Sequence, residues 1–523
     1  MSDLVPVKRA LISVFNKTGL ADFARALHGE FGIELISTGG TAKFLRDLGL
    51  PVTDVSQITG FPEMMDGRVK TLHPKIHGGL LAIRDNAEHV AAMQAHGIQP
   101  IDLVCINLYP FEQTIAKPGV TFDEAIENID IGGPSIIRSA AKNHRFVLVV
   151  TSTDRYEKVL GDLREHAGRS CGKHRLKQAQ RAFSQTAQYD GMIANYLATV
   201  AGLPRGDEIE LRLKKKQELR YGENPHQKAA LYVGDKPAEA SVAFATQLHG
   251  KELSYINLLD ADAALAAVKE LATPAACIVK HASPCGYGTG PDIATAFRRA
   301  FAGDPLASFG GIVALNQPVD LACAQAITSI DKLLEVIVAP AYEPEALALL
   351  KTRWKNVRLL EVGPVGTLDQ ADRQDWMLHK IVGGYLVQDR DLAAVPELKI
   401  VSKRKPTDQE LSDLRLAWVA CKHVKSNAIT ICGGGAVVGI GGGQVDRVNA
   451  ARIAIYKAGE RGRGAVAASD AFFPFPDGPE LLLNAGITAI IQPGGSVKDQ
   501  ETLDLVDRHD AALVLTGQRH FRH

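Results

Sequence analysis

The sequence predicts an α/β protein with two domains. Residues 8 to about 150 alternate apolar, strand-like segments with segments of helical pattern. A polar stretch rich in Pro and Gly follows at 202–207, and beyond it a mixed α/β pattern resumes. A chain of 523 residues is also too long for a single hydrophobic core. We therefore expect a first domain over 1–205 and a second domain over 212–523.

The first domain is expected to contain a parallel sheet with helices on both faces, because strands and helices alternate along the chain. The expected strands are 10–14, 33–36, 103–108 and 146–150, and the expected helices include 19–28 and 42–48. A helical segment follows from 154 to about 200. Its predicted core-facing stripe, with spacings of three or four, consists of Leu176, Ala179, Phe183 and Ala187.

The second domain is expected to contain two similar subdomains, although the sequence shows no clear repeat. Two apolar strands, 277–279 and 428–432, each run into a polar loop. Two Gly-rich runs lie nearby at 433–435 and 441–443. Their spacing is not that of a dinucleotide-binding loop, so we expect them to be turns that flank a strand over 436–440.

The composition excludes several classes of protein. Lys plus Arg and Asp plus Glu each total 59, so no net charge attracts nucleic acid or an anionic membrane. The sequence has no apolar run long enough to span a bilayer and no signal peptide. The seven cysteines are scattered without a CxxC pair, which indicates reduced thiols and a cytoplasmic protein.

Two turns of the first domain suit an anion. Residues 16–19 and 37–41 each follow a strand and open a helix, and both contain Gly and hydroxyl side chains. Backbone N–H groups and the helix dipole favour negative charge at such positions. Taken alone, each turn is better explained as an ordinary helix cap. Because the two lie in consecutive β-α units, we favour a phosphate site.

Further polar residues of the first domain suit proton transfer. Arg68 and Lys70 are two residues apart, so an extended chain would place both cations on one face. They would hold a phosphate or stabilise an oxyanion, unless they form a solvated basic edge. Tyr109, Asp130 and Lys142 follow without the spacing of metal ligands. A phenol, a carboxylate and lysines are typical of a condensation that uses no cofactor.

In the second domain, Lys280 and His281 stand side by side where a strand gives way to a loop. Both side chains move protons near neutral pH when their surroundings shift them. Neighbours in a strand point to opposite faces, so both reach one pocket only if the backbone leaves strand geometry. Ser283, Pro284 and Gly286 supply that break. The alternative is a surface lysine beside a histidine that caps a turn.

Several segments resemble the bifunctional enzymes that perform the last two steps of purine synthesis. VKHASPCG (279–286), RYGENPHQ (220–227) and SDAFFPF (469–475) are similar to the family's transformylase segments. SVFNKTG, STGGT, GRVKTLHP, NLYPF, IDIGG and AAKNH are similar, in order, to its cyclohydrolase segments. The resemblance covers nearly the whole chain. It implies a methylglyoxal-synthase-like first domain and a second domain of two cytidine-deaminase-like subdomains.

The resemblance implies two reactions. A formyl group passes from 10-formyltetrahydrofolate to aminoimidazole-carboxamide ribonucleotide, and the product then closes to inosine monophosphate with loss of water. For ring closure, Lys70 would stabilise the oxyanion, and Tyr109, Asp130 and Lys142 would move protons, with acid and base left open. The first-domain residues that would bind the substrate are Lys17, Ser37, Thr38, Gly39, Arg68, Thr71 and Asn107.

Formyl transfer needs a base near the weakly nucleophilic amine and an acid near the folate nitrogen. By resemblance His281 is the base, Lys280 is the acid, with a lowered pKa, and Asn427 donates to the formyl oxygen. The residues expected to bind the nucleotide are Arg220, Tyr221, Asn257, Arg519 and His523. Those expected to line the folate side are Phe472, Phe475 and Asp477. The alternatives are a frayed chain end and a packed aromatic loop.

We expect no prosthetic group and no catalytic metal, with the folate acting as a co-substrate. By resemblance a structural potassium ion lies near Asp470, and two copies of the chain form a homodimer with shared transformylase sites. The expected partners are nucleotide and folate, not nucleic acid or membrane. The sequence departs from the family at Ser283, where many members have Asn, and at Gln185, where many have His.

Two rival functions remain to be weighed. Pro284 and Cys285 match half of the zinc-deaminase motif, but Gly288 stands where the second Cys belongs and no HxE precedes it, so we reject a zinc deaminase. The first domain alone also fits a regulatory ligand-binding module. Mutation of Lys70 separates regulation from catalysis, because a regulatory module would leave ring closure intact.

Overall fold

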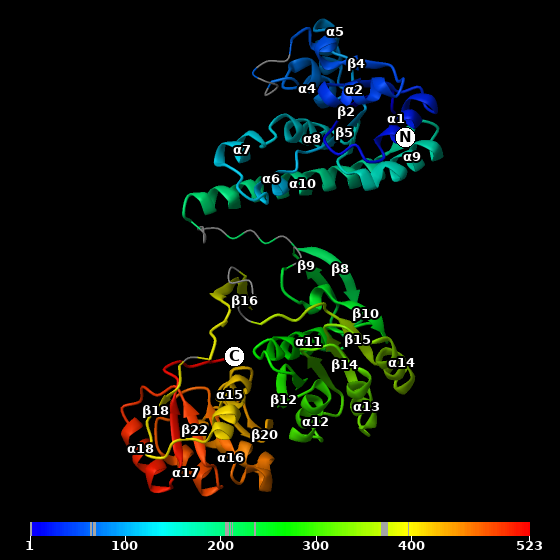
Figure 1. Cartoon of the computed structure of the whole chain (residues 1–523). Helices are drawn as coiled ribbons and strands as arrows, with labels where there is room; N and C mark the ends of the chain where they lie inside the picture. The colour runs from blue at the N-terminus through cyan, green and yellow to red at the C-terminus, as the bar shows by residue number, and fades with distance from the viewer. Residues whose placement is uncertain are drawn as a thin grey trace. The chain divides into compact units, whose positions relative to one another are not determined.

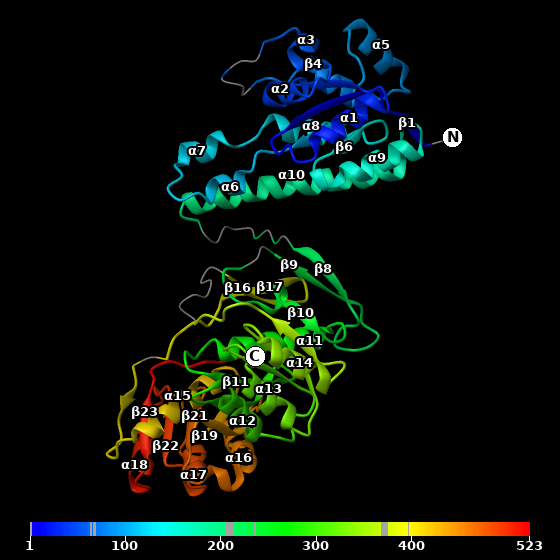
Figure 2. The same ribbon diagram turned by 45° about the vertical axis from the view of Figure 1, so that its right-hand side comes forward.

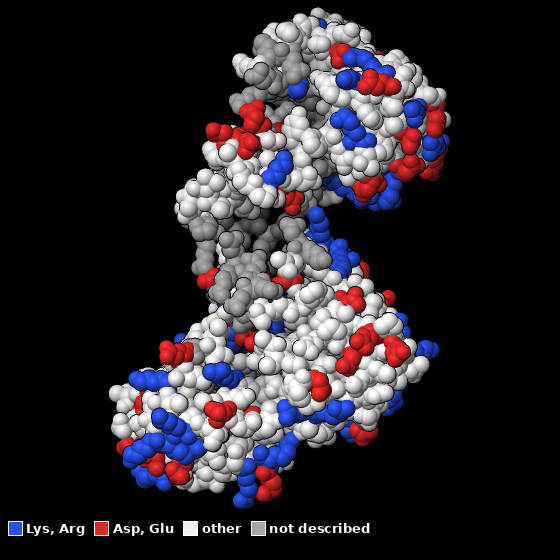
Figure 3. All heavy atoms as spheres, viewed as in Figure 1, with Lys and Arg blue, Asp and Glu red and all other residues white. Residues whose placement is uncertain are grey.

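The computed structural model describes residues 3–62, 65, 69–203, 209, 211, 213–234, 237–367, 375–395 and 397–523. The chain divides into two compact units, Met1–Arg212 and Leu213–His523. Each unit has its own sheet and its own hydrophobic core clusters. Lys and Arg are interspersed with Asp and Glu on the surface drawn in Figure 3, as the balanced composition predicts.

The first unit is built on a five-stranded parallel sheet of order β4-β3-β2-β5-β6. The strands are β2 (Arg9–Val14), β3 (Glu34–Ser37), β4 (Val52–Asp54), β5 (Leu103–Asn107) and β6 (Leu148–Val150). A short pair, β1 (Leu4–Pro6) and β7 (Arg169–Cys171), lies outside this sheet. The predicted parallel sheet is therefore confirmed.

Helices cover both faces of this sheet. Alternate residues of the central strand β2 face opposite ways: Ile12 packs in a core cluster with α1 (Leu20–Gly29) and α9 (Tyr156–Glu165), whereas Leu11 packs with α4 (Pro74–Leu81) and α8 (Gly132–Lys142). The long helix α10 (Gly172–Val200) lies beside α8 (Figure 1). The remaining helices are α2 (Gly39–Asp47), α3 (Val55–Thr59), α5 (Ala87–Ala95), α6 (Phe111–Ile115) and α7 (Phe122–Glu127).

The predicted stripe of α10 is wrong except at Ala179. Leu176 and Phe183 are 56% and 39% exposed, and Ala187 is exposed as well. The buried side carries four polar residues beside two alanines: Arg175, Gln178, Thr186 and Tyr189, with Ala179 and Ala182. Their hydrogen bonds explain the difference. The Arg175 guanidinium, for example, donates to the His144 carbonyl at 2.9 Å, which allows a polar group to be buried.

The second unit is built on one twelve-stranded sheet whose two halves have the same order of elements. The first half, green in Figures 1 and 2, contains β10 (Thr246–His249), α11 (Tyr255–Val268), β11 (Ala275–Lys280), β12 (Ser283–Thr289), α12 (Ile293–Gly303), β13 (Gly311–Leu315), α13 (Leu321–Ser329), β14 (Leu334–Ala339), α14 (Pro344–Arg353) and β15 (Arg358–Glu361). The second half, yellow to red, contains β18 (Lys399–Ile400), α15 (Asp408–Lys422), β19 (Ile429–Gly433), β20 (Ala436–Gly441), α16 (Arg447–Ala458), β21 (Val466–Ser469), α17 (Asp477–Asn484), β22 (Ala489–Gln492), α18 (Asp499–Arg508) and β23 (Ala512–Leu515).

The strand pairings repeat as well. In each half an antiparallel hairpin leads through one antiparallel and two parallel pairings to an antiparallel edge strand. The predicted pair of similar subdomains is therefore confirmed, and so is the hairpin predicted from the Gly-rich run. The halves join where Gly288 of β12 lies opposite Ala436 of β20.

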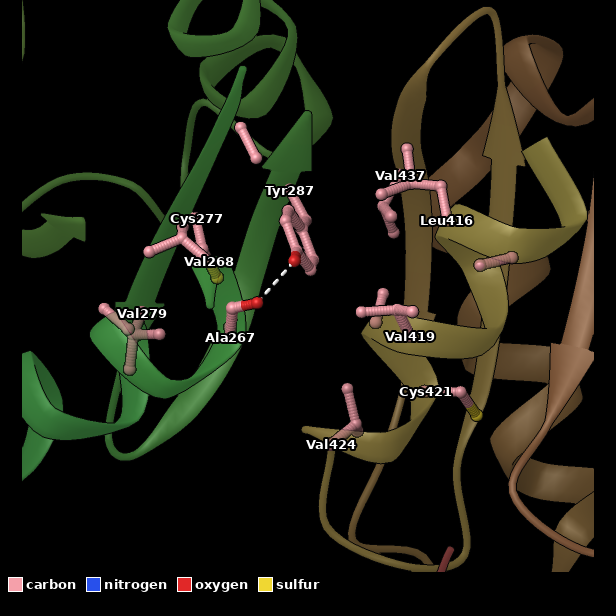
Figure 4. Close-up of a cluster of buried hydrophobic side chains, with 14 of the residues drawn as sticks. Ala267, Val268, Cys277, Val279, Tyr287, Leu416, Val419, Cys421, Val424 and Val437 are labelled. Carbon is pink, nitrogen blue, oxygen red and sulfur yellow. Dashed lines mark hydrogen bonds between the residues drawn. The ribbon is translucent and has the colours of Figure 1, made fainter. Parts of the chain in front are cut away.

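A shared core joins the two halves on one side of the sheet. Helices α11 and α15 both contribute to it, and the Tyr287 hydroxyl donates to the Ala267 carbonyl at 2.6 Å within it (Figure 4). Leu416 and Val419 of α15 lie on the opposite side of this cluster (Figure 4). Two further hairpins, β8 (Lys214–Leu219) with β9 (Ala229–Val233) and β16 (Trp376–Ile381) with β17 (Gly384–Asp389), lie outside the large sheet. Among the described residues, no helix is long and apolar enough to cross a membrane.

Candidate active sites

A cavity of about 630 Å³ opens in the first unit where β2, β3 and β5 end. The first residues of α2 and α8 line it, so two helix N-termini face the same space. Ligands of parallel α/β sheets bind at the carboxyl ends of the strands. The partial positive charge of the helix N-termini favours an anion there. The lining residues are Ser13, Val14, Phe15, Lys17, Thr38, Gly39, Gly40, Thr41, Lys70, Thr71, Ile106, Asn107, Tyr109, Ile126, Glu127, Asn128, Ile129, Asp130, Ile131, Gly132, Gly133 and Ile136.

One end of this cavity combines a glycine turn with cations. Gly39 has a φ of 53°, a conformation that suits glycine, and it opens α2. The Lys70 ammonium lies 4.0 Å from the point that a Cβ on Gly39 would occupy. Lys17 and Thr38 line the same cavity. The structure therefore brings these four predicted residues together around one helix N-terminus.

A carboxylate lies in the same cavity. Burial raises the pKa of Asp130, while the N–H of Gly133, a backbone hydrogen bond with Tyr109 and the charge of Lys70 act in the opposite direction. Gly133 donates to Asp130 Oδ1 at 2.8 Å, and a Cβ on Gly133 would fall 2.5 Å from Asp130 Oδ2. Only glycine fits this close approach. A carboxyl with a raised pKa beside a lysine and a phenol is suited to proton transfer.

The sequence analysis missed Tyr189 of α10. The Asp130 N–H donates to the Tyr189 hydroxyl oxygen at 2.7 Å, and that hydroxyl donates to the Asn128 carbonyl at 3.3 Å. Burial raises the pKa of Tyr189 to about 12, so the phenol keeps its proton. Tyr189 thus ties the loop that carries Asp130 to the long helix. A tyrosine inside a helical segment gives no sequence signal for this contact.

Two predicted residues of the first unit have other surroundings, and a third lies outside the described residues. The Ser37 hydroxyl is completely buried and donates to the Ile12 carbonyl at 2.6 Å, and Ser37 does not line the cavity. Lys142 is exposed at the last residue of α8, and it does not line the cavity either. Arg68 lies outside the described residues. A role of any of these three residues in the reaction therefore stays a prediction.

Two more predicted residues do line the cavity. Thr71 is 7% exposed and lies where α8 begins, 2.9 Å from the point that a Cβ on Gly132 would occupy. The Asn107 carboxamide oxygen accepts from the N–H groups of Phe15 and Asn16 at 2.7 Å and 3.0 Å. Asn107 therefore shapes the loop after β2 as well as lining the site.

In the second unit, Lys280 and His281 stand at the turn of the β11–β12 hairpin. Lys280 pairs with Ser283, so His281 and Ala282 are the two turn residues. Their φ angles are 56° and 55°, so the backbone does leave strand geometry at these two residues. The predicted source of the break is wrong, because Ser283, Pro284 and Gly286 belong to strand β12. The Lys280 ammonium donates to the Phe309 carbonyl at 2.8 Å, and His281 is exposed. Neither residue lines the cavity of about 230 Å³ that lies beside Ser283.

Asn427 is held in a buried polar network that the sequence analysis did not foresee. Its carboxamide oxygen accepts from the Arg447 guanidinium at 2.8 Å, and its amide nitrogen donates to the Gln444 carbonyl at 2.9 Å. Arg447 also pairs with Asp470, which is completely buried, and the Ser426 hydroxyl donates to Asp470 Oδ2 at 2.5 Å. With its oxygen tied to a cation, the amide keeps one N–H for another acceptor.

The chain end is docked and not frayed. His520 is 3% exposed and bonds Asp391 Oδ2 at 2.6 Å through Nδ1. The backbone of Arg522 exchanges hydrogen bonds with Ser426, next to Asn427. The predicted residues Arg519 and His523 are both exposed and alternate with these docked ones. The tail therefore presents every second residue to the outside, as an extended chain does.

The other predicted residues are not gathered in a described cavity. The Arg220 guanidinium lies 4.8 Å from the ring centre of Tyr221, near the loop that follows β8. Asn257 caps α11, because its side-chain oxygen accepts from the Ser254 N–H at 3.1 Å. Phe472 and Phe475 are 38% and 54% exposed, and Asp477 opens α17. Their predicted contacts with nucleotide and folate stay predictions.

Comparison with known proteins identifies the family. Residues 140–457 match the family described as AICARFT/IMPCHase bienzyme, and residues 19–135 match the MGS-like domain. The chain is 52% identical over 518 residues, 99% of its length and 100% of theirs, to the bifunctional purine biosynthesis proteins PurH of Bacillus mycoides and of Bacillus cereus (strain AH820). The chain belongs to the AICARFT/IMPCHase bienzyme family.

Members of this family are enzymes with two activities, and so is this chain. It transfers the formyl group of 10-formyltetrahydrofolate to aminoimidazole-carboxamide ribonucleotide (AICAR) and closes the product to inosine monophosphate (IMP). The predicted activities and the methylglyoxal-synthase-like first domain are confirmed. Among solved structures, that of ForH is 32% identical, with a TM-score of 0.33 over 38% of this chain and 98% of that one.

Proposed function

We propose that the first unit closes the ring and that the second unit transfers the formyl group. The observation that carries this division is the 630 Å³ cavity, because it gathers Lys70, Tyr109 and Asp130 beside two helix N-termini within one unit. A ribonucleotide phosphate suits the end lined by Lys17 and Thr38. In the second unit, Lys280 ends β11 and His281 is exposed in the turn that follows.

For ring closure, we assign Asp130 as the base. The carboxamide nitrogen gives its proton to Asp130 and attacks the formyl carbon, so a C–N bond forms and the formyl oxygen gains negative charge. The Lys70 ammonium stabilises that oxygen. Tyr109 then protonates that oxygen to a hydroxyl group. Asp130 returns its proton to the same oxygen, the C–O bond breaks and water leaves, while the N–H of the former formamide gives its proton to the Tyr109 phenolate and the C=N bond of the ring forms. The raised pKa of Asp130 makes it a stronger base than an ordinary aspartate.

For formyl transfer, we assign His281 as the base for the amine and Lys280 as the acid for the folate nitrogen. The amine attacks the formyl carbon, the remaining N–H of Asn427 donates to the formyl oxygen, and the C–N bond to the folate breaks as that nitrogen is protonated. The Lys280 contact with the Phe309 carbonyl holds the ammonium near a neighbouring loop. The Arg447 contact fixes the orientation of Asn427.

One assay tests this division. Purified protein receives either AICAR with 10-formyltetrahydrofolate, or the formylated nucleotide alone. We expect His281→Ala to lower formyl transfer by about 100-fold or more and to leave ring closure unchanged. We expect Lys70→Met to lower ring closure by a similar factor and to leave formyl transfer unchanged. If Lys70→Met leaves ring closure intact, the first unit is a regulatory module and the proposal fails.

We also propose that the chain functions as a homodimer. The β16–β17 hairpin exposes apolar side chains on a two-stranded sheet, an arrangement that is marginally stable in water unless it is covered. These side chains are Met377, Leu378, Ile381, Val382, Tyr385, Leu386 and Val387. A second copy of the chain is the proposed cover. Sedimentation should give a dimer, and Leu386→Asp should weaken it; a monomeric parent chain with full activity would contradict the proposal.

A structural potassium ion and a cytoplasmic location complete the proposal. The buried Asp470 carboxylate and the Ser426 hydroxyl are hard oxygen donors and fit such an ion. Replacing potassium by tetramethylammonium at equal ionic strength should lower the midpoint of thermal unfolding, and an unchanged midpoint would count against the ion. The seven cysteines are all free thiols, which suits a reducing compartment.

A further inference from the structure

We propose that Asp260 is a positioning residue for formyl transfer. Its buried carboxylate fixes the hairpin turn that presents Lys280 and His281. This inference rests on the proposed roles of those two residues. It concerns a residue that is not expected to contact either substrate.

The turn adopts a backbone that its residues disfavour. Two-residue hairpin turns with positive φ at both positions strongly prefer Gly, Asn or Asp. Here the two positions are His281 and Ala282, with φ angles of 56° and 55°. A histidine and an alanine in the left-handed region both carry a steric cost. Something outside the turn must therefore stabilise it.

Asp260 supplies that stabilisation. It lies on α11 and is 5% exposed. Its Oδ2 accepts from the His281 N–H at 3.1 Å, and its Oδ1 accepts from the Ala282 N–H at 2.6 Å. A carboxylate that accepts two backbone N–H groups makes charge-assisted bonds, which are stronger than neutral ones. Both hydrogen bonds form only when the two N–H groups point toward Asp260, as they do in this left-handed turn.

The second half of the sheet contains the same device without the strained side chains. Asp413 on α15 is 4% exposed and accepts from Gly434 N–H at 3.0 Å and Gly435 N–H at 2.7 Å. These glycines form the turn of the β19–β20 hairpin, with φ angles of 63° and 76°. Glycine adopts such angles without steric cost. The aspartate is thus common to both halves, but only the first half uses it to hold residues with side chains.

The difference between the two turns indicates what the disfavoured backbone of the first turn is for. A glycine turn carries no side chain, whereas the left-handed turn of the first half places His281 at the exposed tip of the hairpin. If the turn relaxes, the Cα–Cβ direction of His281 changes, and so does the reach of its imidazole. A displacement of about 1 Å in a reacting group costs about 100-fold in rate. Asp260 therefore acts on the rate of formyl transfer through the direction of His281.

The test compares matched variants of the full-length protein. Asp260→Asn keeps one acceptor oxygen, so one of the two turn N–H groups loses its partner. We expect its kcat for formyl transfer to fall about 100-fold, its KM for the nucleotide to change less than about threefold, and its ring closure to stay unchanged. Asp413→Asn is the control, because its turn consists of glycines. We expect this control to change formyl-transfer kcat less than about threefold.

A rescue experiment separates positioning from general stability. In the Asp260→Asn background, Ala282→Gly removes one of the two steric costs and should recover about tenfold of the lost kcat. Folding of each variant is followed by thermal unfolding. The inference is overturned if Asp260→Asn keeps kcat within about threefold of the parent, or if both aspartate variants lose activity in proportion to their unfolding midpoints. His281→Ala is measured in parallel: if it retains formyl transfer, the proposed role of His281 fails, whatever Asp260 does.

Discussion

Individual buried charges set the chemistry at the scale of the residue. Asp130 combines burial, which raises its pKa, with a nearby lysine, which limits that rise. Asp470 has the opposite arrangement, since Arg447 and the Ser426 hydroxyl both compensate its buried charge. The first arrangement leaves a carboxylate able to take a proton, and the second gives a structural carboxylate whose buried charge is stabilised by its neighbours. Only the first is suited to acid–base catalysis.

The pH dependence of ring closure should report Asp130. A base acts only when it is ionised, so kcat/KM should rise with pH through the raised pKa of Asp130 and level off above it. The charge of Lys70 lowers that pKa. Lys70→Met should therefore move the acid limb to higher pH, whereas Lys70→Arg should leave it in place. The residual activity of Lys70→Met, measured from pH 4 upward, checks this; an acid limb that stays fixed in both variants would exclude Asp130 as the base.

The same group should reduce the stability of the folded protein at neutral pH. The pKa of Asp130 is higher in the folded protein than in the unfolded chain, so the folded state binds the proton more tightly. The stability that this proton contributes is fully present below the unfolded pKa and is lost as pH rises through the folded pKa. Asp130→Asn should thus unfold at the same or a higher temperature at pH 7, yet lose ring closure. A lower unfolding midpoint would show that ionised Asp130 stabilises the fold.

At the scale of the element, the C-terminal segment packs next to Asn427, the residue proposed to donate to the formyl oxygen. Its contacts are with Asp391 and Ser426. Truncation after Gln518 removes the His520–Asp391 bond and the two hydrogen bonds that the Arg522 backbone makes with the N–H and the hydroxyl of Ser426. We expect the loss of these bonds to destabilise the second unit by ~1–3 kcal/mol and to loosen the segment that carries Asn427. Formyl transfer should fall at least about tenfold while ring closure is kept. The double substitution Arg519→Ala with His523→Ala, which removes only exposed side chains, is the matched control for docking and should leave the unfolding free energy unchanged.

The helices and strands also show which features can be predicted from the sequence and which cannot. The parallel sheet and the Gly434–Gly435 hairpin follow from local rules of pattern and turn chemistry, and both were predicted. The stripe of α10 was not, because Arg175 and Tyr189 are buried through hydrogen bonds that apolar periodicity does not report. The pairing of Asp260 with the hairpin turn was missed for a related reason. Asp260 lies 21 residues before His281, and only the packing of α11 against the sheet brings them together.

At the scale of the whole molecule, the cores of the two units are separate. Three clusters of buried side chains lie within the first unit, and three lie within the second. In the part of the chain that the structure describes, none of these clusters draws side chains from both units. A unit with its own core is expected to fold alone. The two activities should therefore be separable by cutting the chain between 203 and 213.

The separation experiment tests the division of labour without any point mutation. A fragment of residues 1–203 should unfold cooperatively and close the ring of the formylated nucleotide with a kcat within about threefold of the parent chain. A fragment of residues 213–523 should transfer the formyl group and release the formylated nucleotide unclosed, because it lacks the cavity that holds Lys70 and Asp130. Mixing the fragments should restore conversion of AICAR to IMP. If the first fragment is folded but inactive, ring closure needs a contribution from beyond its own cavity, and the assignment of this reaction to one unit is wrong.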